Sequence, residues 1–115
     1  MHNRRTRRTP SVVGAIRHYL EALCLKRGME AASLTTDDGL MIAGAGHLDV
    51  EWMGALGAST SRRSFEFESR TMHVNRFVVN GVSLCLTTAG APIRDDSALG
   101  SLRRIIETPS VLATA

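Results

Sequence analysis

Long apolar runs are missing from this 115-residue sequence. No stretch approaches the roughly 20 apolar residues of a transmembrane helix. No continuous hydrophobic segment follows the basic N-terminus, which argues against a secretory signal. Aromatic residues make up only 4% of the chain, so the core of the one domain that this length accommodates should be mainly aliphatic. The bulky members expected in that core are Trp52, Phe65, Phe67 and Phe77.

Cysteine is also scarce. Cys24 and Cys85 both stand in apolar patterns, the first in an expected helix and the second in an expected strand. Isolated cysteines of this kind are more typical of buried free thiols than of a disulfide, and structural disulfides are rare in reducing compartments. We therefore expect two free thiols and a cytoplasmic location.

The residue patterns that support catalysis or cofactor binding are absent too. The sequence has no P-loop, no His and Cys spacing typical of a metal site, and no serine in a GxSxG motif. His47 and Asp49 form the one close histidine–acid pair, and capping of a helix start explains Asp49. The acidic pairs fall at a turn, on a solvent-exposed strand face and at a helix start. We expect a protein that is not an enzyme and that uses no cofactor or metal.

Acidic residues are missing from the first nine positions, which hold Arg4, Arg5, Arg7 and Arg8. Removing these four charges from the net charge of +3 leaves −1 for the other residues, so the basicity belongs to a tail. Residues 1–9 also lack apolar periodicity and should be disordered. Such a tail is either a solvated terminus or an electrostatic arm for nucleic acid or an anionic membrane.

Helical and strand patterns alternate along the remaining sequence. The Asp38-Gly39 and Asn80-Gly81 pairs are strong signals for tight hairpin turns, and the Gly44-Ala45-Gly46 segment should end the second strand. The predicted elements are a helix at 11–27, strands at 29–36 and 40–43, a helix at 48–60, strands at 65–70, 72–79 and 82–88, and a last helix, capped by Asp95-Asp96, that ends near Glu107. Hairpin connections dominate this order, so the sheet should be antiparallel.

The middle helix, 48–60, lacks the charged face of a helix that meets water. Its only charges, Asp49 and Glu51, lie in the first turn, where the helix dipole favours them. One broad side carries Leu48, Trp52, Met53 and Leu56, and the other carries Val50, Gly54, Gly57 and Ala58. We expect the chain's own sheet to cover one side and a second subunit to cover the other.

The two glycines suggest which side meets the second subunit. Each glycine costs about 1 kcal/mol relative to alanine inside a helix, and close approach of a partner helix would offset this. The predicted interface residues are Val50, Trp52, Met53, Gly54, Gly57 and Ala58. The alternative is a contact through Trp52 and Met53, with the glycine side against the sheet.

Residues 29–107 resemble the roadblock family, also called the dynein light chain roadblock family. The likeness begins with AASLTTDDGLMIA at 31–43, which is similar to that family's strand, acidic-glycine turn and second strand. It continues with Asp49 and Glu51 before an alanine- and glycine-rich helix, FVVNGVSLCLTT at 77–88, and Ala98-Leu99-Gly100 in the last helix. The first helix also matches the family's layout.

The resemblance implies an α/β sandwich, in which a five-stranded antiparallel sheet has the middle helix on one face and the terminal helices on the other. Family members form homodimers or heterodimers with a paralogue, by joining sheet edges and packing the middle helices together. They are non-catalytic scaffolds or regulators of Ras-like small GTPases or of motor complexes. We thus expect a roadblock-like domain at 10–108 and a frayed C-terminus at 109–115. The leading hypothesis is a dimer that regulates a small GTPase, and the alternatives are a purely structural dimerisation subunit or a tail that binds nucleic acid or anionic membranes.

Overall fold

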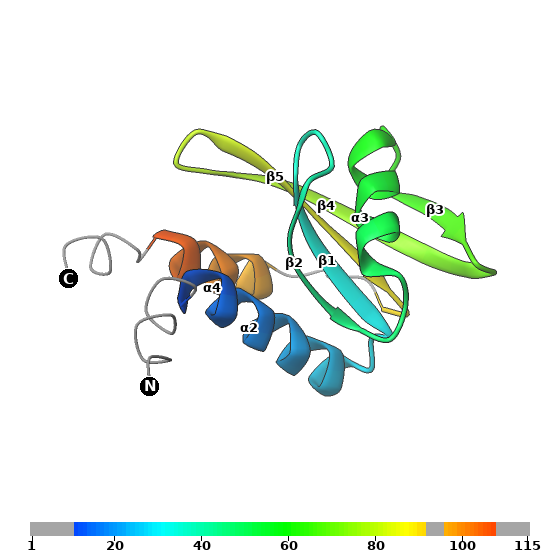
Figure 1. Cartoon of the computed structure of the whole chain (residues 1–115), viewed down its shortest axis with the longest axis horizontal. Helices are drawn as coiled ribbons and strands as arrows, with labels where there is room; N and C mark the ends of the chain where they lie inside the picture. Colours follow the sequence, from blue (N-terminus) through cyan, green and yellow to red (C-terminus); the bar gives the residue numbers. More distant parts are fainter. Residues whose placement is uncertain (1–10, 92–95, 108–115) are drawn as a thin grey trace, which may run out of the picture.

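The structure is a computed structural model, and it describes residues 11–91 and 96–107. Figure 1 shows its elements in sequence colours. In chain order they are α2 (Ser11–Arg27), β1 (Ala31–Thr36), β2 (Met41–Gly46), α3 (Val50–Ser59), β3 (Ser64–Phe67), β4 (Arg70–Val79), β5 (Val82–Ala89) and α4 (Asp96–Glu107).

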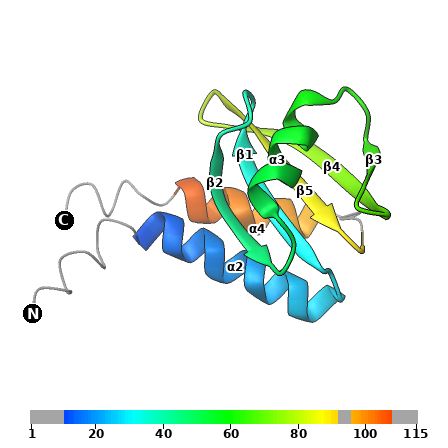
Figure 2. The same cartoon turned by 45° about the vertical axis from the view of Figure 1, so that its right-hand side comes forward.

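The five strands form one antiparallel sheet in the order β2-β1-β5-β4-β3. Helix α3 lies on one face of this sheet, and α2 and α4 lie on the other (Figure 2). Alternate residues of β1 show the division, because Ala31 packs with α3 whereas Leu34 packs with α2 and α4. The predicted fold class and order of elements are confirmed.

The face beneath α2 and α4 holds the larger core. Leu20 of α2, Leu34 of β1, Leu86 of β5 and Leu102 of α4 are fully buried there. The hydroxyl of Tyr19 donates a hydrogen bond to the backbone oxygen of Ala98 at 3.0 Å and so joins the two helices. The core is aliphatic, as the scarcity of aromatic residues predicts.

Strand β2 is longer than predicted, because it continues through the Gly44-Ala45-Gly46 segment. Gly44 is needed in this strand since Cγ2 of Val50 lies 2.7 Å from where its Cβ would be. The glycine therefore serves the packing of α3 and does not end the strand. Helix α3 begins at Val50, with Asp49 as the predicted cap, whose side chain accepts a hydrogen bond from the backbone N–H of Trp52 at 3.2 Å.

The predicted strand at 65–70 is also wrong at its end. The chain turns at Glu68 and Ser69, whose φ angles of 53° and 63° are positive, and β4 starts at Arg70. Turns with positive φ favour Gly, Asn and Asp, so this turn carries no recognisable signal in the sequence.

Several predictions concern residues outside the described ranges: the tail at 1–9 with its four arginines, the cap at Asp95, and the segment at 109–115. Cys24 and Cys85 are free thiols, as predicted. In residues 11–91 and 96–107, no helix has both the length and the hydropathy needed to cross a membrane.

Candidate partner-binding surface

Helix α3 packs on the sheet through glycines. A Cβ atom on Gly54 would lie well under 3.0 Å from Oγ of Ser33, and one on Gly57 would lie equally close to Oγ1 of Thr87. Real Cβ atoms essentially never come so near to another atom. The glycines therefore let the helix backbone approach the side chains of β1 and β5 directly, which offsets their unfavourable helix propensity.

The predicted orientation of α3 is wrong in consequence. Gly54 and Gly57 lie against the chain's own sheet, and Met53 is fully buried beside them. Val50 is half-buried with its methyl group over Gly44. Met53, Gly54 and Gly57 are therefore buried in the contact between α3 and the sheet, and Val50 is partly covered by it. The alternative prediction placed the glycine side against the sheet and turned Trp52 and Met53 toward a partner. It is correct for the glycines and wrong for Met53, which is buried.

The outward side of α3 carries Trp52, which is 58% exposed. The prediction that Trp52 belongs to the core is therefore wrong. Leu56 of α3 and Phe65 of β3 are half-buried and pack against the cluster that contains Met53 and Phe67. Ala58 is also partly exposed. We call Trp52, Leu56, Ala58 and Phe65 the α3 surface; Leu56 and Phe65 are the members that sequence analysis missed.

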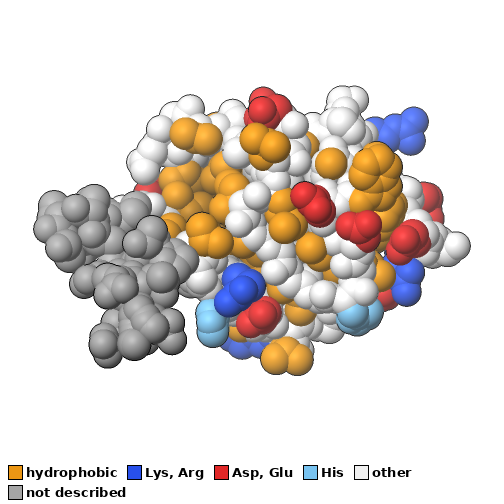
Figure 3. All heavy atoms as spheres, viewed as in Figure 1, with side chains coloured by type: hydrophobic (Ala, Val, Ile, Leu, Met, Phe, Trp, Pro, Cys, Tyr) orange, Lys and Arg blue, Asp and Glu red, His pale blue; other side chains and the backbone are white. Residues whose placement is uncertain are grey.

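Acidic side chains lie near the α3 surface. Asp49 and Glu51 are exposed at the start of α3, and Glu68 is exposed in the turn after β3. Helix α3 itself contains no basic residue. Figure 3 shows hydrophobic side chains over α3 with Asp and Glu side chains beside them. This combination of an apolar centre and a charged rim is the usual composition of a protein–protein interface.

Strand β3 forms the sheet edge next to the α3 surface. It has four residues, and in the described sheet it pairs only with β4. Its outer backbone groups are thus open to pairing with another strand. The edge and the helix surface are continuous, because Leu56 and Phe65 pack against the same cluster.

Arg76 of β4 holds the C-terminal end of α3. Its Nη2 donates hydrogen bonds to the backbone oxygens of Gly57, at 3.0 Å, and of Thr60. A cation at this end of a helix is favoured by the helix dipole. Sequence analysis missed this role, although one signal is present: Arg76 stands at the same strand parity as Met72 and Val74, which are buried.

Cys85 lies beside Arg76, whose Nη1 is 3.6 Å from its Sγ. Burial raises the pKa of the Cys85 thiol, and the positive charge of Arg76 opposes this only partly. The thiol is therefore protonated at neutral pH and suits a packing role better than a nucleophilic one.

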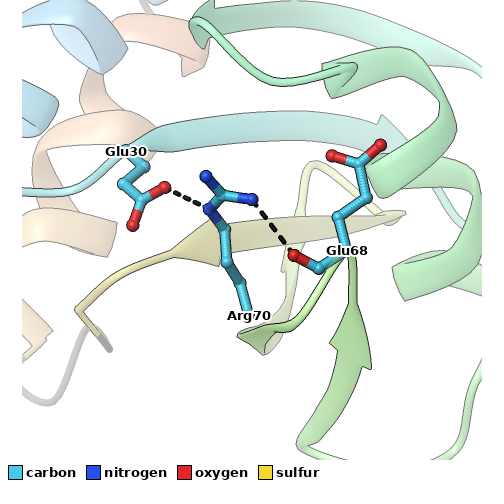
Figure 4. A network of polar contacts seen from close by, with 3 residues as sticks. All are labelled: Glu30, Glu68 and Arg70. Carbon is cyan, nitrogen blue, oxygen red and sulfur yellow. Dashed lines mark hydrogen bonds and ion pairs between the residues drawn. The ribbon is translucent and has the colours of Figure 1, made fainter.

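A polar network fixes the other end of the β3 edge. The guanidinium of Arg70 forms an ion pair with Glu30, which precedes β1, and its Nη1 donates to the backbone oxygen of Glu68 at 3.1 Å (Figure 4). The positive-φ turn at Glu68 and Ser69 is thereby tied to the start of β1. The network supports the hairpin that presents Phe65.

No group of three or more His, Cys, Asp or Glu residues within 11–91 and 96–107 is arranged to hold a metal ion. His47 is joined to the sheet by its backbone N–H, which donates to the oxygen of Glu30 at 3.4 Å. Asp49 is used as a helix cap, which is the role predicted for it.

Comparison with known proteins places the fold. No protein-family model matches the sequence, and no curated protein sequence matches it significantly. Among solved structures, Myxococcus xanthus MglB is similar, with a TM-score of 0.50 and 16% sequence identity over 89% of this chain and 86% of that one. The chain has the roadblock fold, as the sequence resemblance predicts.

Proposed function

We propose that this chain is a non-catalytic, dimeric interaction module of the roadblock type that binds and regulates a Ras-like small GTPase in the cytoplasm. The observation that carries the proposal is the exposed Trp52 on the outward side of α3, in a chain that has the roadblock fold and in whose sheet β3 is an edge strand. The resemblance to the roadblock family supplies the class of partner.

A second copy of the chain, or a paralogue, covers part of the α3 surface in this proposal. Tryptophan is enriched among the residues that dominate binding energy at interfaces. Two edge strands β3 can pair through their backbones while Trp52 and Leu56 of the two α3 helices pack together. The glycine side of α3 has no part in this contact, since the sheet occupies it.

The small GTPase binds the assembled dimer in this proposal. Nucleotide belongs to the partner, because the sequence contains no P-loop. The domain responsible spans residues 10–108, and the tail with Arg4, Arg5, Arg7 and Arg8 plays no required part.

The experiment mixes the purified full chain with each small GTPase encoded in the same genome, loaded with GDP or with a non-hydrolysable GTP analogue. Calorimetry measures binding, and single-turnover assays measure GTP hydrolysis. We expect one GTPase to bind, with a preference for one nucleotide state. Trp52→Glu should abolish dimerisation and weaken binding at least tenfold. The matched control is Leu25→Glu, since Leu25 is 88% exposed on α2 and should tolerate the charge.

Two results would contradict the proposal. If no small GTPase binds and the parent is a dimer, the chain is a structural dimerisation subunit. If the chain alone binds or hydrolyses GTP, the proposal that nucleotide is handled only by a partner is wrong. Salt-sensitive binding to DNA or anionic vesicles that is lost on removing residues 1–8 would favour the tail as the functional element.

A further inference from the structure

A basic hollow lies where the connection from α3 to β3 meets β4. Its volume is about 410 Å³, and its lining residues are Ser61, Arg62, Arg63, Val74, Asn75 and Arg76. Three of these six residues are arginines and none is acidic. The hollow is separate in composition from the α3 surface, which is apolar with an acidic rim.

The backbone holds this hollow in shape. Strand β3 begins at Ser64 and pairs with β4 no further than His73, so Val74, Asn75 and Arg76 extend beyond it. The N–H of Val74 donates to the oxygen of Arg63 at 2.7 Å, and the N–H of Arg62 donates to Oγ1 of Thr60 at 3.2 Å. These bonds fix the backbone of the connection, so Arg62 and Arg63 are held next to β4.

No described carboxylate forms an ion pair with the arginines of the hollow. Arg62 and Arg63 are exposed and form no ion pair with any described residue. Arg76 is fixed by the oxygens of Gly57 and Thr60, which are neutral groups and leave its charge in place. Three like charges around one hollow repel one another, and an anion placed between them relieves this repulsion.

We infer that this hollow binds an oxyanion, either a phosphate group or a carboxylate. Guanidinium groups present donors in a planar fork that matches both, and their hydrogen bonds to ionised oxygens are strong. Arginine clusters are the usual means of recognising phosphorylated or acidic motifs. This inference does not rest on the proposed binding of a small GTPase, and its test uses the chain alone.

The test is an NMR titration of the ¹⁵N-labelled full chain with sodium phosphate, sodium acetate or sodium chloride at matched ionic strength. The amide signals of residues 61–63 and 74–76 and the Nε–H signals of the arginines are followed. We expect saturable shifts with phosphate or acetate, confined to the hollow, and none with chloride. Saturation by phosphate alone identifies a phosphate group as the ligand, whereas equal saturation by acetate identifies a carboxylate as sufficient.

Variants assign the binding to the arginines. Arg62→Gln combined with Arg63→Gln should weaken binding at least tenfold, and their exposure means that the fold should be kept, which the remaining signals report. Arg17→Gln combined with Lys26→Gln removes the same charge from the exposed surface of α2 and should leave binding unchanged. Equal loss in both variants, or shifts that do not saturate in the parent, would overturn the inference.

Discussion

The two faces of the sheet are packed by different kinds of side chain. On one face, leucines from α2, α4 and the strands interlock in an aliphatic core. On the other, Gly54 of α3 rests on Oγ of Ser33 and Cγ2 of Thr35, and Gly57 rests on Oγ1 of Thr87. The first arrangement removes much apolar surface from water, which is the main source of stability. The second holds a smaller apolar cluster around Met53, Phe67 and Met72 and brings the helix backbone very close to the sheet.

The close approach of α3 leaves no room for Trp52 beneath the helix, so its side chain points outward. Met53, Gly54 and Gly57 of this helix are buried, and Val50 and Leu56 are half-buried against the same cluster as Met53. Trp52 remains exposed on the outer side. The face beneath α2 and α4 therefore holds the larger core, and the opposite face brings the α3 backbone close to the sheet and leaves Trp52 exposed.

The largest loss of stability is expected from a cavity in the core beneath α2 and α4. Leu34→Ala should lower the free energy of unfolding by about 2–5 kcal/mol, because Leu34 is fully buried between β1 and the two helices. Urea denaturation followed by circular dichroism measures the change. A loss below about 1 kcal/mol would mean that this face is loosely packed and that the contrast between the faces is wrong.

Gly57→Ala should cause the next largest loss of stability. Its added Cβ would overlap Oγ1 of Thr87, and overpacking of this kind typically costs about 1–3 kcal/mol. The control is Gly14→Ala in α2, where nothing lies within 4 Å of the added Cβ; it should raise stability by up to about 1 kcal/mol. Equal responses of the two helices to alanine would show that α3 does not approach the sheet closely. Combining Gly57→Ala with Thr87→Ala should cost less than the two changes summed, since the second removes the obstructing hydroxyl.

Ser33→Ala tests the buried hydroxyls beneath α3. The hydroxyl oxygen of Ser33 is buried without a hydrogen-bond partner in the described structure, whereas Thr35 and Thr87 lie beside the thiol of Cys85. An unsatisfied buried hydroxyl is unfavourable, so its removal should leave the free energy of unfolding unchanged or raise it by up to about 1 kcal/mol. Thermal unfolding by calorimetry measures this. A clear loss of stability would show that the hydroxyl of Ser33 makes a hydrogen bond, and would contradict this interpretation of the face beneath α3.

Glu30→Gln should have the smallest effect. The side chains of Arg70 and Glu30 are 38% and 39% exposed, and an ion pair that meets water contributes less than about 1 kcal/mol. The small loss should shrink further in 1 M salt, where the charges are screened. Paired urea titrations at low and high salt measure this loss in the free energy of unfolding. A loss that does not change with salt would mean that Glu30 stabilises the fold by packing and not by its charge.

The sequence predicted those features that depend on local periodicity and turn chemistry. The first helix was predicted with the bounds that the structure gives, Ser11–Arg27, because its apolar repeat and basic last turn are both clear. The Asn80-Gly81 turn likewise joins β4 and β5 as predicted. The turn at Glu68 and Ser69 could not be predicted, since neither residue is a usual choice for positive φ.

The orientation of α3 could not be predicted because both of its sides are apolar or small. Periodicity shows where a helix has a polar side, and this one has none in its last turns. The deciding fact is the row of small hydroxyl residues on β1 and β5, which leaves room for a helix backbone and not for Trp52. That fact depends on strand register, which pairs Thr35 with Cys85 and Ser33 with Thr87.

Light scattering coupled to size exclusion, applied to the parent chain and to Trp52→Glu, tests most directly whether the outward side of α3 is the contact surface. We predict a parent mass of twice the chain mass of 12.5 kDa and a Trp52→Glu mass of one chain, with the melting temperature of the domain largely kept. A parent that stays at the mass of one chain at high micromolar concentration, or a Trp52→Glu variant that remains a dimer, would contradict this account.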